Sequence, residues 1–168
     1  MIRPAQISDL PAIEQVYAAA RAFMRKNGNM NQWVNGYPQR ELLIEDMERG
    51  HLFVIEENGA VHGAFAFILG EDPTYNYIED GQWLNDRPYG TIHRIGTDGM
   101  IHGAVKAALD FALRFTDQVR ADTHADNHPM QHTLSKNGFV RCGVIYLENG
   151  DPRVAYEKRI SESFGGIS

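Results

Sequence analysis

Residues 91–124 read TIHRIGTDGMIHGAVKAALDFALRFTDQVRADTH. The stretch has three parts: a strand-like run over 91–97, apolar residues at helical spacing over 102–115, and a second strand-like run over 119–124. A strand, a helix and a strand in this order predict a right-handed crossover between parallel neighbours. We therefore expect two parallel strands at the centre of the fold.

The flanking sequence predicts the rest of the sheet and three more helices. In chain order the preceding elements are a strand over 1–6, a helix from Ser8 or Asp9 to Asn27, a helix around 42–47, and a hairpin of strands over 51–56 and 61–68 with a turn at Asn58-Gly59. The following elements are a helix from Pro129 to Asn137-Gly138 and a hairpin of strands over 139–147 and 153–158.

These elements predict one domain over 1–160 and a disordered tail over 161–168. The fold class is α/β, of the mixed α+β kind. We expect a central mixed sheet of six or seven strands, mostly antiparallel, with about four flanking helices and one parallel pair that splays apart.

Composition limits the partners of the protein. The 168 residues carry a net charge of −6, which disfavours a nucleic-acid groove and suits a small cationic partner. Cys142 is the single cysteine, so no intrachain disulfide can form. The apolar runs are short and no signal-peptide core is present, which indicates a cytoplasmic protein without a membrane segment.

The turn between 96 and 103 has the features of an anion site. Gly99 and Gly103 let the backbone curl closely around a pyrophosphate, and the first amides of the following helix have no intrahelical partner. The alternative is a plain strand-to-helix turn whose glycines serve geometry alone.

The sequence after the crossover points to a family. Asp126-Asn127 follows the second parallel strand, and a short helix then ends at Gly138-Phe139. This order of elements resembles the GNAT superfamily of acetyl-CoA-dependent N-acetyltransferases. Further matches, which resemble a bacterial subgroup of unassigned substrate, are Asn31-Gln32-Trp33, Gly36-Tyr37-Pro38, Trp83-Leu84 and His93-Arg94.

The resemblance implies acetyl-CoA as co-substrate and no metal. The implied cofactor residues are Ile95, Gly96, Thr97, Gly99, Met100, Ile101, His102, Gly103, Ala104, Val105, Asn127 and Met130. Met100 stands where the family has Arg or Gln, and Val105 where it has Gly or Ala. The expected site therefore relies on backbone amides, with His102 as an additional donor.

The catalytic groups are predicted from the residues near the splay. Leu134 occupies the position where the family commonly has a Tyr as general acid, so the acid is either another residue or absent; Tyr146, on the late strand, is our candidate. His93 is our candidate base, relayed through water, since imidazole titrates near neutrality. Strand alternation predicts that His93 and Arg94 face opposite sides, and Arg94 and Asp122 are expected in a buried ion pair.

The acceptor pocket is expected from two aromatic-bearing loops. Its predicted residues are Trp33, Tyr37, Tyr75, Trp83 and Tyr89, accompanied by the carboxylates of the 69–89 loop. Aromatic faces with carboxylates suit a cationic amine of a small molecule or peptide. The alternative is that these aromatics anchor the loops.

Two other functions stay open from the sequence. A non-catalytic acyl-CoA-binding or sensor module would fit the degenerate turn and the missing Tyr. A metal-dependent hydrolase would use His124, His128 and His132, although Pro129 interrupts the helix that this spacing needs. The sequence leaves the acceptor and the acyl chain length undecided. It also leaves the oligomeric state undecided, with a homodimer as one alternative.

Overall fold

The structure is a computed structural model that describes residues 1–160. Its strands are β1 (Ile2–Pro4), β2 (Leu52–Glu57), β3 (Ala60–Leu69), β4 (Gly90–Thr97), β5 (Gln118–Thr123), β6 (Val140–Tyr146) and β7 (Pro152–Arg159). Its helices are α1 (Leu10–Lys26), α2 (Arg40–Glu48), α3 (Ala104–Ala112) and α4 (His128–Lys136), with short 3-10 turns η1 (Ile7–Asp9) and η2 (Pro73–Tyr75). The tail predicted over 161–168 lies outside the described residues.

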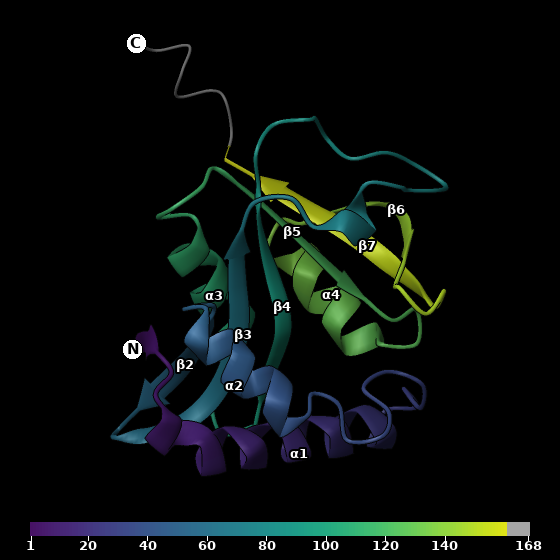
Figure 1. Ribbon diagram of the computed structural model, residues 1–168. Coiled ribbons are helices and arrows are strands. Elements are labelled where there is room, and N and C mark those ends of the chain that lie inside the picture. The colour runs from purple at the N-terminus through teal and green to yellow at the C-terminus, as the bar shows by residue number, and fades with distance from the viewer. Residues whose placement is uncertain (161–168) are drawn as a thin grey trace.

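The strands form one mixed sheet in the order β1-β2-β3-β4-β5-β7-β6 (Figure 1). Only β4 and β5 are parallel, and the other neighbours are antiparallel. The predicted fold class is therefore confirmed, with seven strands and four α-helices among the described residues. The Asn58-Gly59 turn is also as predicted, since both residues have positive φ and join β2 directly to β3.

The two parallel strands separate soon after they begin. They pair only at Gly90 with Val119 and at Thr91 with Arg120. Beyond these pairs, the edge of β4 that faces β5 has no strand partner. The sheet thus opens at its centre, toward the carboxyl ends of both strands.

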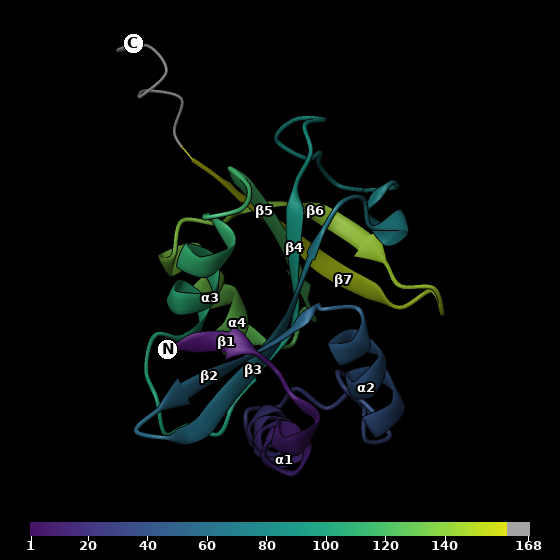
Figure 2. The same ribbon diagram turned by 60° about the vertical axis from the view of Figure 1, so that its left-hand side comes forward.

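Helices cover both faces of the sheet. Figure 2 shows α3 and α4 on one side and α1 and α2 on the other. Strand alternation supplies both cores: Phe65 packs toward α3, whereas its neighbour Ala64 packs toward α1 with Ile13 and Tyr17. Within residues 1–160, no helix combines the length and apolarity needed to cross a membrane.

A β-bulge interrupts β4 at Arg94 and Ile95. Ala66 lies opposite His93 and Ala64 opposite Gly96, so two residues of β4 face one residue of β3. Arg94 has a φ of 51°, and its carbonyl accepts a 2.6 Å hydrogen bond from the Tyr17 hydroxyl. The bulge therefore re-aims the side chains of β4 just where the sheet opens.

Helix α3 is shorter than predicted. The sequence predicts a helix over 102–115, but α3 spans Ala104–Ala112. It starts later because Gly103 precedes it in the left-handed region, at a φ of 74°, and residues 113–115 form a turn after its end. The positions before Gly103 consequently belong to a turn, and the first amides of α3 have no intrahelical acceptor.

Candidate active site

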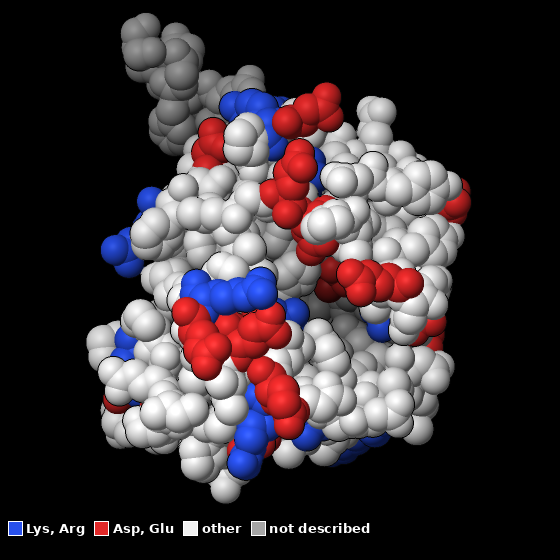
Figure 3. Space-filling view, in the orientation of Figure 1, with Lys and Arg blue, Asp and Glu red and all other residues white. Residues whose placement is uncertain are grey.

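A cavity of about 790 Å³ occupies the opening between β4 and β5 and continues toward α2 and the β6–β7 loop. Figure 3 shows the corresponding hollow, with Asp and Glu side chains and Lys or Arg side chains around it. The cavity has an apolar part beside α3 and α4 and a polar part beside η2, α2 and the start of β7.

The apolar part lies between the separated strands. Its walls include Ile95 of β4, Ala121 of β5, Val105 of α3, and Met130 and Leu134 of α4. Of the predicted cofactor residues, Ile95, Val105, Asn127 and Met130 line the cavity. A narrow apolar space beside an unpaired strand edge is suited to an extended amide-containing chain, which can pair with that edge.

The turn from Thr97 to Gly103 joins this space to the start of α3. Gly99 and Gly103 both have positive φ, and a Cβ built on either would meet nothing within 4 Å. The Met100 amide donates to the Asp98 carboxylate, while the Met100 side chain is exposed. No side chain caps α3. The first amides of α3 therefore have neither an intrahelical nor a side-chain acceptor.

Gly96 has a packing role besides any cofactor contact. A Cβ at this position would come within 3.2 Å of Ala20 and Tyr17 on α1. The glycine therefore allows α1 to approach the bulged strand closely.

Asn127 is buried and caps α4. Its Oδ1 accepts from the Met130 amide, and its Nδ2 donates to Oε1 of Gln32. The same Gln32 oxygen accepts from Asn29, and Gln32 Nε2 lies 3.5 Å from the Thr123 hydroxyl. These bonds tie the 28–38 segment to the open end of β5.

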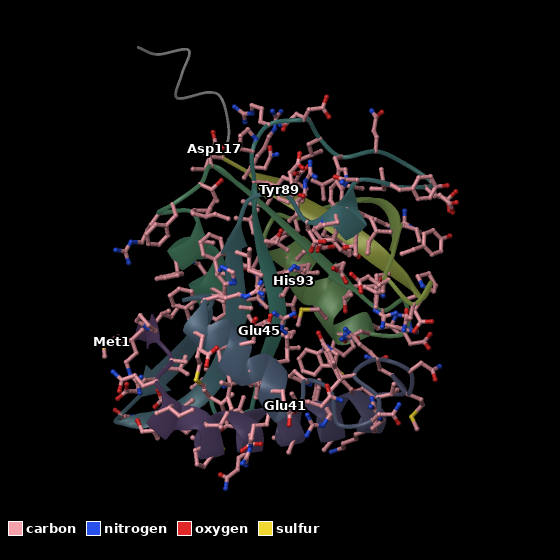
Figure 4. All side chains as sticks on the ribbon, viewed as in Figure 1. Met1, Glu41, Glu45, Tyr89, His93 and Asp117 are labelled. Carbon is pink, nitrogen blue, oxygen red and sulfur yellow. The ribbon has the colours of Figure 1, made fainter. Side chains whose placement is uncertain are left out.

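The polar part of the cavity contains a histidine–carboxylate pair. His93 Nε2 lies 2.9 Å from Oδ2 of Asp72, and Figure 4 places His93 near the centre of the molecule beside β4. Burial raises the pKa of Asp72, but hydrogen bonds from His93 and Thr74 and the charge of His93 lower it to about 2. The ionised carboxylate can only accept, so Nε2 donates to it; in the neutral form of the imidazole, Nδ1 is then the proton acceptor.

The loop before β4 positions this pair. The Asp72 amide donates to the Tyr89 hydroxyl at 2.8 Å, and the other Asp72 oxygen accepts from the amide and hydroxyl of Thr74. Asp72 is thereby fixed in front of His93.

Arg94 also lines the cavity, which corrects the prediction that alternation would keep it away from His93. The bulge removes the strict alternation. The predicted ion pair with Asp122 is wrong, because Arg94 Nη2 pairs with Asp46 of α2 at 2.8 Å, and Nη1 lies 3.4 Å from the Tyr37 hydroxyl. Asp122 instead accepts a 2.6 Å bond from Tyr75.

The predicted acceptor residues divide into two groups. Trp33 and Tyr37 line the cavity. Tyr75, Trp83 and Tyr89 are not part of its wall; they pack the 70–89 loop against β6 and β7. The reason is Arg120, whose guanidinium lies 4.1 Å from the Trp83 ring centroid and 3.9 Å from that of Tyr89.

Tyr146 is likewise outside the cavity wall. Its hydroxyl lies 2.6 Å from Oε2 of Glu79, and Tyr77 bonds the other oxygen of the same carboxylate. The hydrogen bond to Glu79 raises the pKa of Tyr146. A role as acid would require this bond to break.

The histidines proposed as metal ligands do not converge. Among residues 1–160, no three His, Cys, Asp or Glu side chains are placed to hold a metal ion. Helix α4 begins at His128, one residue before the predicted start, and the His124 ring nitrogen accepts from the Asp126 amide.

Sequence and fold comparisons identify the family. The model of the acetyltransferase (GNAT) domain matches residues 1–140. The structure is similar to a GNAT-family acetyltransferase from Streptococcus agalactiae 2603, with 33% identity over 96% of this chain and 95% of that one and a TM-score of 0.87. The chain therefore belongs to the GNAT acetyltransferase family, and it is an acyltransferase that uses acyl-CoA as co-substrate.

More distant structures share the fold. A GNAT-family acetyltransferase from Listeria monocytogenes 4b F2365 is 20% identical over 95% of this chain and 94% of that one, with a TM-score of 0.69. The GNAT-like decarboxylase GphF, solved in complex with isobutyryl-CoA, is 16% identical over 95% and 98%, with a TM-score of 0.65. A search of curated proteins finds no match.

Several residues of the site had no role predicted from the sequence. Asp72 was visible only as one of several loop acids, and neither Asp46 nor Gln32 had been assigned a partner. Arg153, which lines the polar part of the cavity, was not singled out. Each owes its place to contacts between segments far apart in the chain.

Proposed function

We propose that the protein transfers an acetyl group from acetyl-CoA to a primary amine of a small molecule or peptide. The observation that carries this proposal is the continuous cavity, which leads from the opening between β4 and β5 to the His93–Asp72 pair. We further propose a cytoplasmic location, in keeping with the single, unpaired Cys142.

The fit to the co-substrate rests on backbone features. The amides at the start of α3 and the positive-φ glycines at 99 and 103 would hold the pyrophosphate. The unpaired edge of β4 after Thr91 would pair with the pantetheine amides. Acetyl-CoA supplies the activated thioester carbonyl, which a backbone N–H of the opened strand would polarise.

His93 would act as the base. Its Nε2–H donates to Asp72, so Nδ1 can take a proton from the acceptor ammonium, directly or through one water. The neutral amine nitrogen then attacks the thioester carbon and the carbon–sulfur bond breaks. The nitrogen loses its remaining extra proton to solvent to give the amide, and the thiolate takes a proton from solvent to give free CoA. The carboxylates of the polar part, including Asp72 and Asp122, would attract the cationic amine.

An acceptor screen tests the reaction class. Primary amines and the alcohols of the same carbon skeleton are incubated with acetyl-CoA, and thiol release and acetylated product are measured. The proposal predicts amide products from amines and none from alcohols. Ester products from the alcohols would overturn it. Calorimetric CoA binding without thiol release on any amine would favour the sensor module instead.

Replacing His93 tests the base. We expect His93→Ala to lower kcat/KM by about 100-fold or more at neutral pH, the usual contribution of a general base. The loss should shrink toward pH 10, where a growing fraction of an alkylamine is already neutral. His51→Ala, outside the cavity wall, is the matched control. Unchanged kcat/KM of His93→Ala at every pH would exclude the imidazole as base.

A further inference from the structure

Arg153 is a buried cation near the start of β7, and it borders the cavity. Its side chain lines the polar part, and the residue is only 8% exposed. Nη1 donates to the Pro152 carbonyl at 2.8 Å. Within residues 1–160, no carboxylate forms an ion pair with this guanidinium, and no other protein group accepts a hydrogen bond from it.

Two other arginines, the half-buried Arg94 and the buried Arg120, differ in this respect. Arg94 pairs with Asp46 and Arg120 with Glu157, each through a direct contact. A buried charge normally has such a partner, because desolvation is costly without one. Burial lowers the pKa of Arg153, and the nearby charges of Asp122 and Asp151 oppose that effect without touching the guanidinium. The remaining N–H groups of Arg153 are therefore available to a ligand in the cavity.

Strand geometry places Arg153 on the face of the sheet that carries Asp122. Asp122 lies opposite Ala155, so both project to the same face, and Arg153 shares that face because it is two residues from Ala155. Asp122 accepts the hydrogen bond of Tyr75, whose ring centroid is 6.1 Å from that of His93. The intervening Val154 packs on the opposite face with the α3 side of the core. Arg153 thus faces the His93 side and not the phosphate turn.

The surrounding charges indicate which anion would bind. A guanidinium offers a planar pair of donors that matches a carboxylate. Asp122, Glu148 and Asp151 line the same part of the cavity, and they would repel a doubly charged phosphate. A cation surrounded by carboxylates is instead complementary to a zwitterion, whose ammonium and carboxylate can each meet an opposite charge.

We propose that Arg153 binds the carboxylate of an acceptor that carries both a primary amine and a carboxylate, namely an amino acid or a short peptide. This inference rests on the proposed amine acetylation and adds the substrate class. The amine would lie toward His93 and Asp72, and the carboxylate would occupy the free donors of Arg153.

The test compares acceptors that differ only at the anionic group. Amino acids and dipeptides are assayed beside their carboxamides with acetyl-CoA, and kcat/KM is measured for each member of a pair. The enzymes are the wild type, Arg153→Gln, Arg153→Lys and the control Arg141→Gln, which changes an exposed arginine on β6. Thermal unfolding of each variant checks that it is folded.

The expected result is a preference for the carboxylate member of about tenfold to a hundredfold in the wild type, mostly through KM, as for a hydrogen-bonded charge. Arg153→Gln should reduce this ratio to near one, Arg153→Lys should keep part of it, and Arg141→Gln should not change it. Because the same pair of acceptors is used with every enzyme, a difference in amine reactivity within the pair affects each enzyme's carboxylate-to-carboxamide ratio equally and cancels when the enzymes are compared.

Two outcomes would overturn the inference. Equal or better use of carboxamides by the wild type, or an unchanged ratio in folded Arg153→Gln, would refute a carboxylate site while leaving amine acetylation intact. Absence of acetylation for every member, with acetyl-CoA bound, would refute the proposed function and the inference together.

Discussion

Replacing Glu157 with glutamine would leave Arg120 as a buried cation without a counter-charge. In the structure, Arg120 Nε lies 2.6 Å from Oε2 of Glu157, and their side chains are 6% and 0% exposed. The other Glu157 oxygen accepts from the Leu84 amide, so this pair fastens the 70–89 loop to the sheet. That loop carries Asp72, the partner of His93.

The expected cost follows from these contacts. Two unit charges about 4 Å apart attract by about 4 kcal/mol at an effective dielectric constant near 20. Glutamine recovers about 1 kcal/mol through a neutral hydrogen bond. We therefore expect Glu157→Gln to lower the free energy of unfolding by about 3 kcal/mol, within the range for broken buried pairs. For a domain of this size, Tm should fall by about 6 to 12 °C.

Urea and thermal unfolding, followed by circular dichroism, measure this loss. The matched control is Glu45→Gln, which breaks the exposed pair between Glu45 and Arg49 and should cost about 0.5 kcal/mol or less. A loss for Glu157→Gln as small as that of the control would refute the assignment of Glu157 as the counter-charge that Arg120 requires.

Two further predictions concern the site. The folded-state pKa of Asp72 is about 2 and its ordinary value is 3.8, so its ionised form adds stability above about pH 4 that is lost as the pH falls toward 2. Asp72→Asn should therefore flatten the pH dependence of the urea midpoint between pH 4 and pH 2. Equal slopes in the wild type and the variant would contradict the assigned contacts. Gly103→Ala and the control Gly59→Ala each place a side chain at positive φ with open space around it, and both should lose about 1 kcal/mol of stability. Only Gly103→Ala should weaken CoA binding in calorimetry, by about tenfold through loss of a backbone hydrogen bond to an anion; equal CoA affinity in the two variants would argue against the anion site at α3.

The sequence was sufficient for the fold because local signals agreed with one another. The crossover over 91–124, the Asn58-Gly59 turn and the glycine that ends α4 each predict an element without knowledge of its partners. The same local signals predicted the parallel pair that opens at the centre of the sheet, whereas the expected cofactor residues came from the family resemblance and stay a prediction.

Side-chain pairing could not be predicted in the same way. The bulge at Arg94 depends on the register between β3 and β4, and it turns both His93 and Arg94 toward the cavity. The partners of these residues, Asp72 and Asp46, lie 21 and 48 positions away in the sequence. Many other acidic residues lie as far from His93 and Arg94, so distance along the chain does not single out these two partners.

The aromatic residues of the 70–89 loop show the same limit of prediction from sequence. Tyr75, Trp83 and Tyr89 have the composition of a binding pocket, yet Trp83 and Tyr89 face Arg120 and Tyr75 packs against both rings. The Tyr89 hydroxyl also supports Asp72. Composition does not distinguish an aromatic wall that faces a ligand from one that faces a buried cation.

The position of the coenzyme sulfur in a crystal structure of the protein with CoA bound tests the account most directly. We predict the pyrophosphate at the turn between Gly99 and Gly103, the pantetheine along the opened edge of β4, and the sulfur in the cavity on the side of His93 and Asp72. CoA bound outside the opening between β4 and β5, or a sulfur directed away from the His93–Asp72 pair, would contradict it.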